Sequence, residues 1–141
     1  FLSNIKIMFV VLSFYISILN NTSRPKYNFN VLENGKIEFI SENQPTAVKI
    51  WWADNSIARD FRIDVIGKSW KSELITINSE GKYISSIKGP NKGWRAYFLE
   101  AEYSTSGSIP FVVTSEVRVS PDILPFDYID PINTKGFLSK N

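Results

Sequence analysis

The chain has 141 residues, of which 16 are Lys or Arg and 14 are Asp or Glu. That length suffices for one domain with a real core but not for two ordinary domains. Because the charge is nearly balanced and no basic run is present, the composition argues against a nucleic-acid-binding protein, which concentrates its basic residues in a patch or stripe.

The sequence contains neither His nor Cys. Without Cys there is no disulfide, no thiolate nucleophile and no cysteine metal site. Without His the chain lacks the usual general base of a serine or cysteine hydrolase and the commonest zinc ligand. A complete Ser-His-Asp triad cannot be assembled from this chain alone. We therefore predict that it holds no catalytic residues, no metal site and no cofactor.

Residues 5–19 are apolar apart from one Lys and two Ser, and three interpretations of this segment compete. A transmembrane helix needs about 20 apolar residues, so the segment is short for one. A secretory signal starting at Met8 has a suitable apolar length, but no small-x-small cleavage site and no positive charge follow Met8. A helix that is apolar on every side can also lie buried in a larger globular unit. Because the chain begins with Phe1 rather than Met, we favour this third interpretation.

Two overlapping glycosylation sequons, Asn20-Asn21-Thr22 and Asn21-Thr22-Ser23, follow the apolar segment. They make Asn20 and Asn21 candidate glycosylation sites and indicate a secreted protein or one in the secretory pathway. The alternative is chance in a sequence rich in Asn and Ser. Pro25 comes next and blocks continuation of the helix, so this region is expected to be a linker.

From residue 27 onward, short runs rich in β-branched and aromatic residues alternate with turn residues, a pattern typical of strands. Asn34-Gly35 predicts a hairpin with a type I′ turn between strands at 27–31 and 36–40. The other predicted strands are residues 47–53, 61–66, 73–77, 82–87, 94–103 and 111–119. Evenly spaced strands without a helical period between them predict a mainly β fold. We expect an immunoglobulin- or fibronectin type III-like β-sandwich preceded by one apolar N-terminal helix.

Alternation of apolar and polar residues assigns faces to these strands. In residues 94–103 one face is formed by Tyr97, Leu99, Ala101 and Tyr103. In residues 111–119 one face is formed by Phe111, Val113, Ser115, Val117 and Val119. Residues 61–66 alternate in the same way.

Trp51 and Trp52 are consecutive, so in a strand they point to opposite faces and one of them packs in the core. Glu100 and Glu102 share one face and could ligate calcium. Because no further acidic residue is close in sequence, we expect them to lie on a solvated face instead.

Asp54, Arg59, Asp60 and Arg62 lie in and after the loop that follows the two tryptophans. A pair of carboxylates can act as general acid and base, but no His or Cys accompanies them here. Arg–Asp pairs commonly fix a loop against a neighbouring strand. A structural loop and a docking contact with another domain therefore remain as the two interpretations. We take Trp51 with these last three residues, Arg59, Asp60 and Arg62, as the candidate docking residues.

Residues 86–94 contain Gly89, Pro90 and Gly93. A phosphate-binding loop would open a helix, whereas a strand is predicted here, so a tight turn is expected. The predicted organisation is a helix at 1–21, a β-sandwich at 22–126 and a tail at 127–141. The tail is expected to pack along the domain edge and then fray.

Five runs occur in a distinctive order: RPKYNF, GKIEF, VKIWWADNSIARDFR, KGWRAYFLEAEY and VRVSPDILPF. In this order they resemble the C-terminal part of the PhoPQ-activated pathogenicity-related (PqaA-type) family, which includes bacterial proteins and secreted amoebal proteins of the autocrine proliferation repressor type. The resemblance covers residues 13–126. Its most distinctive positions are Trp51, Asn55, 58–62, Gly93-Trp94, Val119, Pro121-Asp122 and 124–126.

The resemblance implies an α/β-hydrolase-like domain followed by a small immunoglobulin-like β-domain. Residues 5–20 would then be the last helix of the hydrolase-like part. The family's serine nucleophile and its acid and His partners would lie upstream, so none of them can be carried onto this chain. The sequence departs from the family pattern in a more uniformly apolar helix, and at Trp52 and Ser56, where a polar residue and a proline are expected.

We therefore predict a non-catalytic C-terminal β-sandwich domain of a PqaA-type α/β-hydrolase-like protein, docked on the hydrolase-like domain of the parent chain. The parent itself could be a serine hydrolase. The alternative is a stand-alone secreted or membrane-anchored β-sandwich that binds another protein. In that case residues 5–19 act as signal or anchor, and an exposed Trp51 or Trp52 contacts the partner. A complete hydrolase is the weakest hypothesis because His is missing.

Overall fold

The computed structural model describes residues 2–105, 107 and 109–127. Most of the predicted tail, residues 128–141, lies outside the described residues. The elements in chain order are α1 (Leu2–Leu19), β1 (Tyr27–Val31), β2 (Ile37–Ser41), β3 (Ala47–Asn55), α2 (Ile63–Ile66), β4 (Lys71–Leu74), β5 (Tyr83–Ile84), β6 (Trp94–Tyr103), β7 (Phe111–Thr114) and β8 (Arg118–Ser120).

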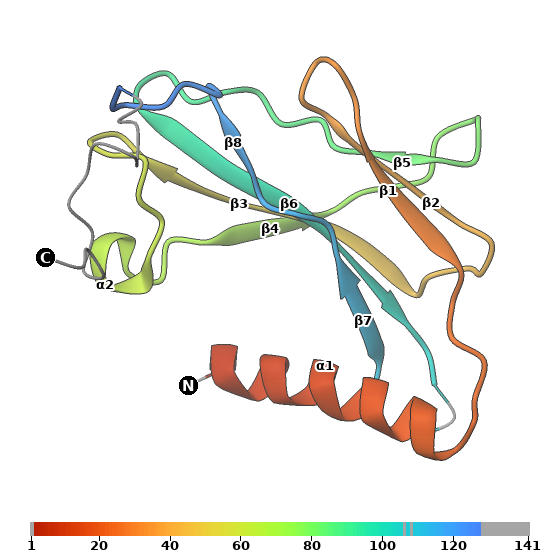
Figure 1. Ribbon diagram of the computed structural model, residues 1–141. Helices are drawn as coiled ribbons and strands as arrows, with labels where there is room; N and C mark the ends of the chain where they lie inside the picture. Colours follow the sequence, from red (N-terminus) through yellow and green to blue (C-terminus); the bar gives the residue numbers. More distant parts are fainter. Residues whose placement is uncertain (1, 106, 108, 128–141) are drawn as a thin grey trace, which may run out of the picture.

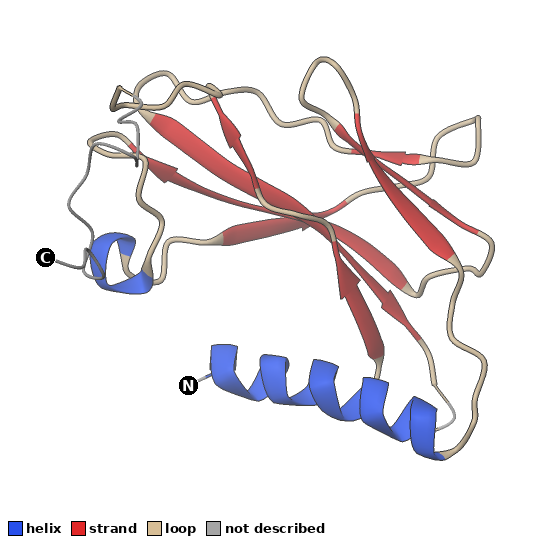
Figure 2. Ribbon diagram, viewed as in Figure 1, coloured by secondary structure: helices blue, strands red, loops and turns tan. Residues whose placement is uncertain are grey.

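The strands form two antiparallel sheets (Figures 1 and 2). One sheet has the order β1-β2-β5. The other has the order β4-β3-β6-β7, and β8 also pairs with β6. The prediction of a mainly β protein with an N-terminal helix is thus confirmed.

The core lies between the two sheets and takes apolar side chains from both of them. Its buried members are Ile37, Phe39, Val48, Ile50, Tyr83, Tyr97, Leu99, Ala101, Tyr103, Phe111 and Val113. The four residues predicted to share one face of β6 are all in this core, so that prediction is confirmed. Among the described residues, no member of this cluster belongs to α1.

The turn between β1 and β2 is fastened to the opposite sheet. The Tyr97 hydroxyl donates to the Gly35 carbonyl at 2.6 Å, and Gly35 has a φ of +78°. The Gly35 N–H bonds the Leu32 carbonyl, and the only non-glycine residue with positive φ in the described part is Asn21. Asn34 therefore lacks the positive φ that a type I′ turn requires. The hairpin was predicted correctly, but its turn is a type I turn followed by a glycine bulge.

Two buried serines end strands in the same way. The Ser115 hydroxyl accepts from the Leu99 N–H at 3.0 Å, and the Ser115 N–H donates to the Leu99 carbonyl. In the other sheet, the Ser85 hydroxyl accepts from the Ile37 N–H at 2.7 Å while the Ser85 N–H donates to the Ile37 carbonyl. In each case a side-chain oxygen replaces the backbone carbonyl that would continue the ladder.

This substitution corrects the prediction of one strand at 111–119. The strand is interrupted at Ser115 and becomes β7 and β8, both paired with β6. Val117, expected to share a face with Phe111 and Val113, is 56% exposed, whereas those two residues are buried. Likewise, the strand predicted at 82–87 is shortened to β5, which ends just before Ser85.

The strand predicted at 61–66 is wrong. Its last four residues form the short helix α2, which follows an extended Arg62 and ends at Gly67, whose φ is +61°. Ile63 is 67% exposed and Val65 is 46% exposed, so the alternating pattern does not mark a buried face. The free edge of β3 is taken instead by β4, whose bounds lie two to three residues before the predicted strand at 73–77.

Helix α1 lies beside the start of β7, at one edge of the β-domain (Figure 1). It buries Ser13 and Ser17, which are four residues apart and so share one helical face. Within the described residues, no helix is long and apolar enough to span a membrane.

Replacing Ser115 with Ala is expected to lower the free energy of unfolding by about 1–3 kcal/mol, because the buried Leu99 N–H loses its acceptor. Ser85→Ala should cost a similar amount by orphaning the Ile37 N–H. The exposed Ser86, changed to Ala, is the matched control and should leave stability within about 0.5 kcal/mol. Urea unfolding of the three variants measures this. Equal stability of all three would contradict the role given to the buried hydroxyls.

Candidate functional site

The distinctive sequence runs meet at one end of the five-stranded sheet. Antiparallel pairing places Asn55, the last residue of β3, opposite Trp94, the first residue of β6. It also places Ser120, at the end of β8, opposite Arg95. The loop after β3, the turn before β6 and the segment after β8 therefore converge (Figure 1). We call this region, residues 54–62, 93–95 and 118–126, the signature corner.

Asn55 organises the loop of the signature corner. Its side-chain amide donates to the Asp60 carbonyl at 2.7 Å. Its side-chain oxygen accepts from the N–H groups of Ile57 and Ala58 at 2.9 and 3.1 Å. Because Asn55 is only 8% exposed, these three bonds hold the loop against the sheet from within.

Gly93 allows the turn before β6 to pass against this loop. A Cβ atom at Gly93 would lie 2.2 Å from the Asn55 carbonyl oxygen, and Gly93 has a φ of +75°. Both the close approach and the positive φ require glycine. The next residue, Trp94, donates its indole N–H to the Ile123 carbonyl at 3.3 Å and so connects the turn to the segment after β8.

Arg59 connects the loop to the segment after β8. Its guanidinium lies 3.4 Å from the Asp122 carboxylate. The guanidinium of Arg118 lies 3.3 Å from the same carboxylate. The Arg59 side chain is 26% exposed, so most of its surface is buried within the signature corner. Asp122 was not among the predicted site residues. It lies 63 residues from Arg59, and only the resemblance had marked both positions.

Asp60 and Arg62 form a bidentate pair at the surface of the corner. Arg62 Nη2 lies 2.7 Å from Asp60 Oδ2, and Arg62 Nε lies 3.0 Å from Asp60 Oδ1. Hydrogen bonds from the Arg62 side chain and then its backbone N–H lower the pKa of Asp60 below its ordinary value. The Arg62 side chain is 68% exposed, compared with 26% for Arg59 and 31% for Asp60.

Asp54 is held by Arg95 on the neighbouring strand. The two side chains make hydrogen bonds of 2.6 and 2.7 Å, and Arg95 also donates to the Lys88 carbonyl. The hydrogen bonds from Arg95 lower the pKa of Asp54. Lowered pKa values suit ion pairing and not proton transfer near neutral pH. Asp54 and Asp60 are therefore suited to the ion pairs that they form with Arg95 and Arg62.

The two tryptophans of β3 are separated by the sheet, as predicted. Trp52 packs against the core cluster. Trp51 lies on the outer face, where its ring stacks on Phe98 with a centroid distance of 6.3 Å and an interplanar angle of 7°. The ring of Trp70 also packs against Phe98, with a centroid distance of 5.4 Å. Trp51 is therefore part of an aromatic cluster on β3 and β6, while Arg59, Asp60 and Arg62 lie beyond the end of β3.

Glu100 and Glu102 do not form the solvated face that we expected. Glu100 is 8% exposed. Lys49 lies opposite Glu100 in the ladder, and its ammonium is 2.6 Å from Glu102 and 3.9 Å from Glu100. Lys49, on the neighbouring strand, therefore forms ion pairs with both carboxylates. In the part of the chain that the structure describes, no cluster of three or more acidic, His or Cys residues could hold a metal ion.

Large apolar side chains remain exposed around the charged pairs of the signature corner. Ile57 is 89% exposed, Leu124 is 70% exposed and Phe126 is 84% exposed. Exposed apolar side chains that form a contiguous patch are typical of interaction surfaces, so the corner is a candidate for one. The candidate glycosylation sites Asn20 and Asn21 lie elsewhere, exposed at the C-terminal end of α1.

Comparison with known proteins now gives the chain a family. A profile described as PhoPQ-activated pathogenicity-related protein matches residues 2–62. Autocrine proliferation repressor protein A of Dictyostelium discoideum is 32% identical over 155 aligned residues, which cover 94% of this chain. The chain belongs to the PhoPQ-activated pathogenicity-related family. It spans 31% of the length of the Dictyostelium protein.

A second relative is more distant. The threonine–tRNA ligase of Ehrlichia canis is 24% identical over 84 residues, which cover 55% of this chain and 13% of that protein. No solved structure matches the chain significantly. The profile match begins in α1 and ends at Arg62, so both the helix and the loop of the signature corner belong to the part shared with the family.

Changing Gly93 to Ala is expected to destabilise the protein by about 3 kcal/mol or more, because it combines a steric clash with an unfavourable φ. The control is Gly81→Ala. Gly81 has a similar φ of +77°, but its Cβ would meet nothing within 4 Å. That variant should lose only about 1–2 kcal/mol. Thermal unfolding of both variants checks the difference, and equal losses would show that the close approach to Asn55 has no energetic weight.

Proposed function

We propose that this chain is the non-catalytic C-terminal β-domain of a PqaA-type α/β-hydrolase-like protein and that it docks on the hydrolase-like domain of its parent. Family membership supports the domain's place in such a protein. The chain corresponds to 31% of the Dictyostelium relative, so a whole protein of this kind has room for another domain. Activity, if the parent has one, would then come from residues outside this chain, since the sequence has no His and no Cys.

The observation that carries the proposal is the orientation of α1. The helix turns its two buried serines, Ser13 and Ser17, towards the β-domain. A stripe of large apolar side chains stays exposed: Met8 is 55% exposed, Val11 63%, Tyr15 56% and Ile18 54%. Spacings of three and four residues place these side chains on one helical face. A helix face of this composition needs a second apolar surface to cover it.

The signature corner offers a second part of the docking surface. Arg62 is accessible there beside the exposed Ile57, Leu124 and Phe126. Arg59 is tied to Asp122, so reversing its charge would also disturb the corner itself. Arg62 is therefore the better candidate for direct contact with another domain, and Asp60 positions it.

The proposed fold is an immunoglobulin-like sandwich. The order β1-β2-β5 in one sheet and β4-β3-β6-β7 in the other corresponds to an A-B-E sheet facing a C′-C-F-G sheet. Such a sandwich presents its outer faces and corners for binding. This suits a domain that recognises another part of the protein.

The test uses a full-length parent protein carrying Val11→Asp and Ile18→Asp. Both side chains are more than half exposed here, so the β-domain itself should keep its stability. If α1 packs on the preceding domain, the two carboxylates remove about 3 kcal/mol or more of apolar burial from the interface. Hydrogen exchange should then show faster exchange in α1 and in the domain that precedes it, with the strands of this chain unchanged.

The control carries Leu74→Asp and Ile77→Asp, two exposed apolar positions in and after the edge strand β4. It should leave exchange in the preceding domain unchanged. Unchanged exchange in the Val11/Ile18 variant as well would contradict docking through α1. Loss of binding to a separate protein, with intact exchange in the parent, would favour the stand-alone binding module instead.

A further inference from the structure

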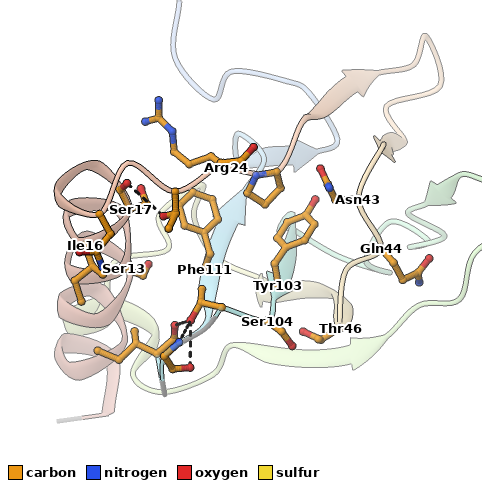
Figure 3. Close-up of a pocket in the computed structure, with 17 residues that line it drawn as sticks. Ser13, Ile16, Ser17, Arg24, Asn43, Gln44, Thr46, Tyr103, Ser104 and Phe111 are labelled. Atoms are coloured by element: carbon orange, nitrogen blue, oxygen red, sulfur yellow. Dashed lines mark hydrogen bonds between the residues drawn. The ribbon is translucent and has the colours of Figure 1, made fainter.

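A groove of about 500 Å³ separates α1 from the β-domain (Figure 3). One wall is formed by the helix, with Ser13 and Ser17. The opposite wall is formed by the segment that joins β2 to β3, with Asn43 and Thr46. Tyr103 and Phe111, from the adjacent ends of β6 and β7, lie between these walls. A volume of this size is typical of small-ligand sites.

The lining of the groove is neutral and rich in hydroxyl groups. Among the described residues that line it, Arg24 carries the only charge. Its guanidinium extends away from the other labelled side chains in Figure 3, and it lies 5.1 Å from the centre of the Phe14 ring. The remaining lining combines hydroxyl and amide groups with two aromatic rings and with the aliphatic side chains of Ile16, Pro25 and Ile109. This chemistry fits a neutral polar ligand with apolar faces, which describes a carbohydrate.

The end of α1 places one of the two sequon asparagines on this groove. The Thr22 N–H bonds the Ser17 carbonyl at 3.0 Å, and the Asn21 N–H bonds the Ile18 carbonyl at 3.1 Å. Asn21 has a φ of +48°, so the helix ends in a Schellman motif with Asn21 as its left-handed residue. As a result Asn20 and Thr22 line the groove, whereas Asn21 does not.

We propose that Asn20 carries an N-linked glycan whose first sugars lie in this groove, between α1 and the β-domain. The oligosaccharide would come from a lipid pyrophosphate donor in the secretory pathway. The bond from sugar C1 to the phosphate oxygen breaks, and a bond from C1 to Asn20 Nδ2 forms. The amide nitrogen loses one proton, and the lipid pyrophosphate is the leaving group. Transfer takes place on the unfolded chain, and folding then closes the groove around the sugars.

The glycan gives the two serines on the inner face of α1 bonding partners in the groove, beside the apolar Ile16. Ser13 and Ser17 donate their hydroxyl hydrogens to carbonyls of their own helix, so their oxygens remain able to accept bonds from sugar hydroxyls. The opposite face of α1, with Val11 and Ile18, stays accessible. Glycan binding and domain docking therefore use different sides of the helix, and either can fail without the other.

The experiment produces the full chain behind a cleavable secretion signal in a eukaryotic host. Asn20→Gln removes the first sequon and leaves Asn21-Thr22-Ser23. Ser23→Ala is the matched control, because it removes the second sequon and leaves the first. Mass spectrometry with and without a peptide N-glycosidase reads occupancy. The native chain and Ser23→Ala should both carry glycan on Asn20.

Hydrogen exchange of the α1 amides then shows whether the sugars contact the helix. The α1 amides should exchange faster in Asn20→Gln than in Ser23→Ala, on the order of tenfold, because bonds between the sugars and the helix are lost. Thr22→Ala also removes the first sequon while keeping the Asn20 side chain. It should raise α1 exchange at least as much as Asn20→Gln, because it also loses the bond from Thr22 Oγ1 to the Ser17 carbonyl. Thr22→Ser keeps the sequon and should behave like the native chain.

An unmodified secreted chain, or glycan found on Asn21 alone, overturns the proposal. Glycan on Asn20 with equal α1 exchange in Asn20→Gln and Ser23→Ala also overturns it, because the sugars would then project into solvent. Faster α1 exchange that follows loss of Asn20 occupancy, in both variants that lack the first sequon, supports it.

Discussion

The pairing of β3 with β6 is the constraint on which the rest of the structure depends. It runs in continuous register from Ala47 opposite Glu102 to Asn55 opposite Trp94. One face of this ladder supplies the centre of the core, and the other carries the stack of Trp51 on Phe98. Because Asn55 lies opposite Trp94 at the end of this ladder, the loop after β3 and the turn before β6 lie next to each other. The signature corner exists because these two long strands end together.

The signature corner is held mainly by contacts among its own residues. Its charged side chains therefore serve first to fix the local structure. Asn55 fixes the loop, Gly93 lets the neighbouring turn approach it, and Asp122 accepts Arg59 and Arg118. Ion pairs at a partly exposed site contribute little stability individually, so their main effect is to set the shape of the loop. The exposed apolar side chains of the corner, Ile57, Leu124 and Phe126, form part of the docking surface that we propose. Helix α1 likewise turns Ser13 and Ser17 towards the β-domain and leaves the stripe of Met8, Val11, Tyr15 and Ile18 exposed.

Much of the fold could be predicted from the alternation of residues along the strands. The bounds of β6 and the separation of Trp51 from Trp52 follow from period-two patterns. The pattern at 61–66 failed because alternation alone does not show whether a strand edge is free to pair, and β4 already occupies the edge of β3. The break at Ser115 depends on a side-chain bond to Leu99, 16 residues away, and no local signal marks it. The partnership of Arg59 with Asp122 is likewise a product of the tertiary fold.

The central claim is that the exposed stripe on α1 is covered by the preceding part of the parent protein. The most direct measurement places a photo-crosslinking amino acid at Tyr15, which is 56% exposed in the middle of the stripe, in the full-length protein. Mass spectrometry then locates the crosslink after irradiation. If the stripe is covered in this way, the crosslink forms within the same chain, to a segment that precedes α1. A crosslink to a second protein, or none at all, would contradict it.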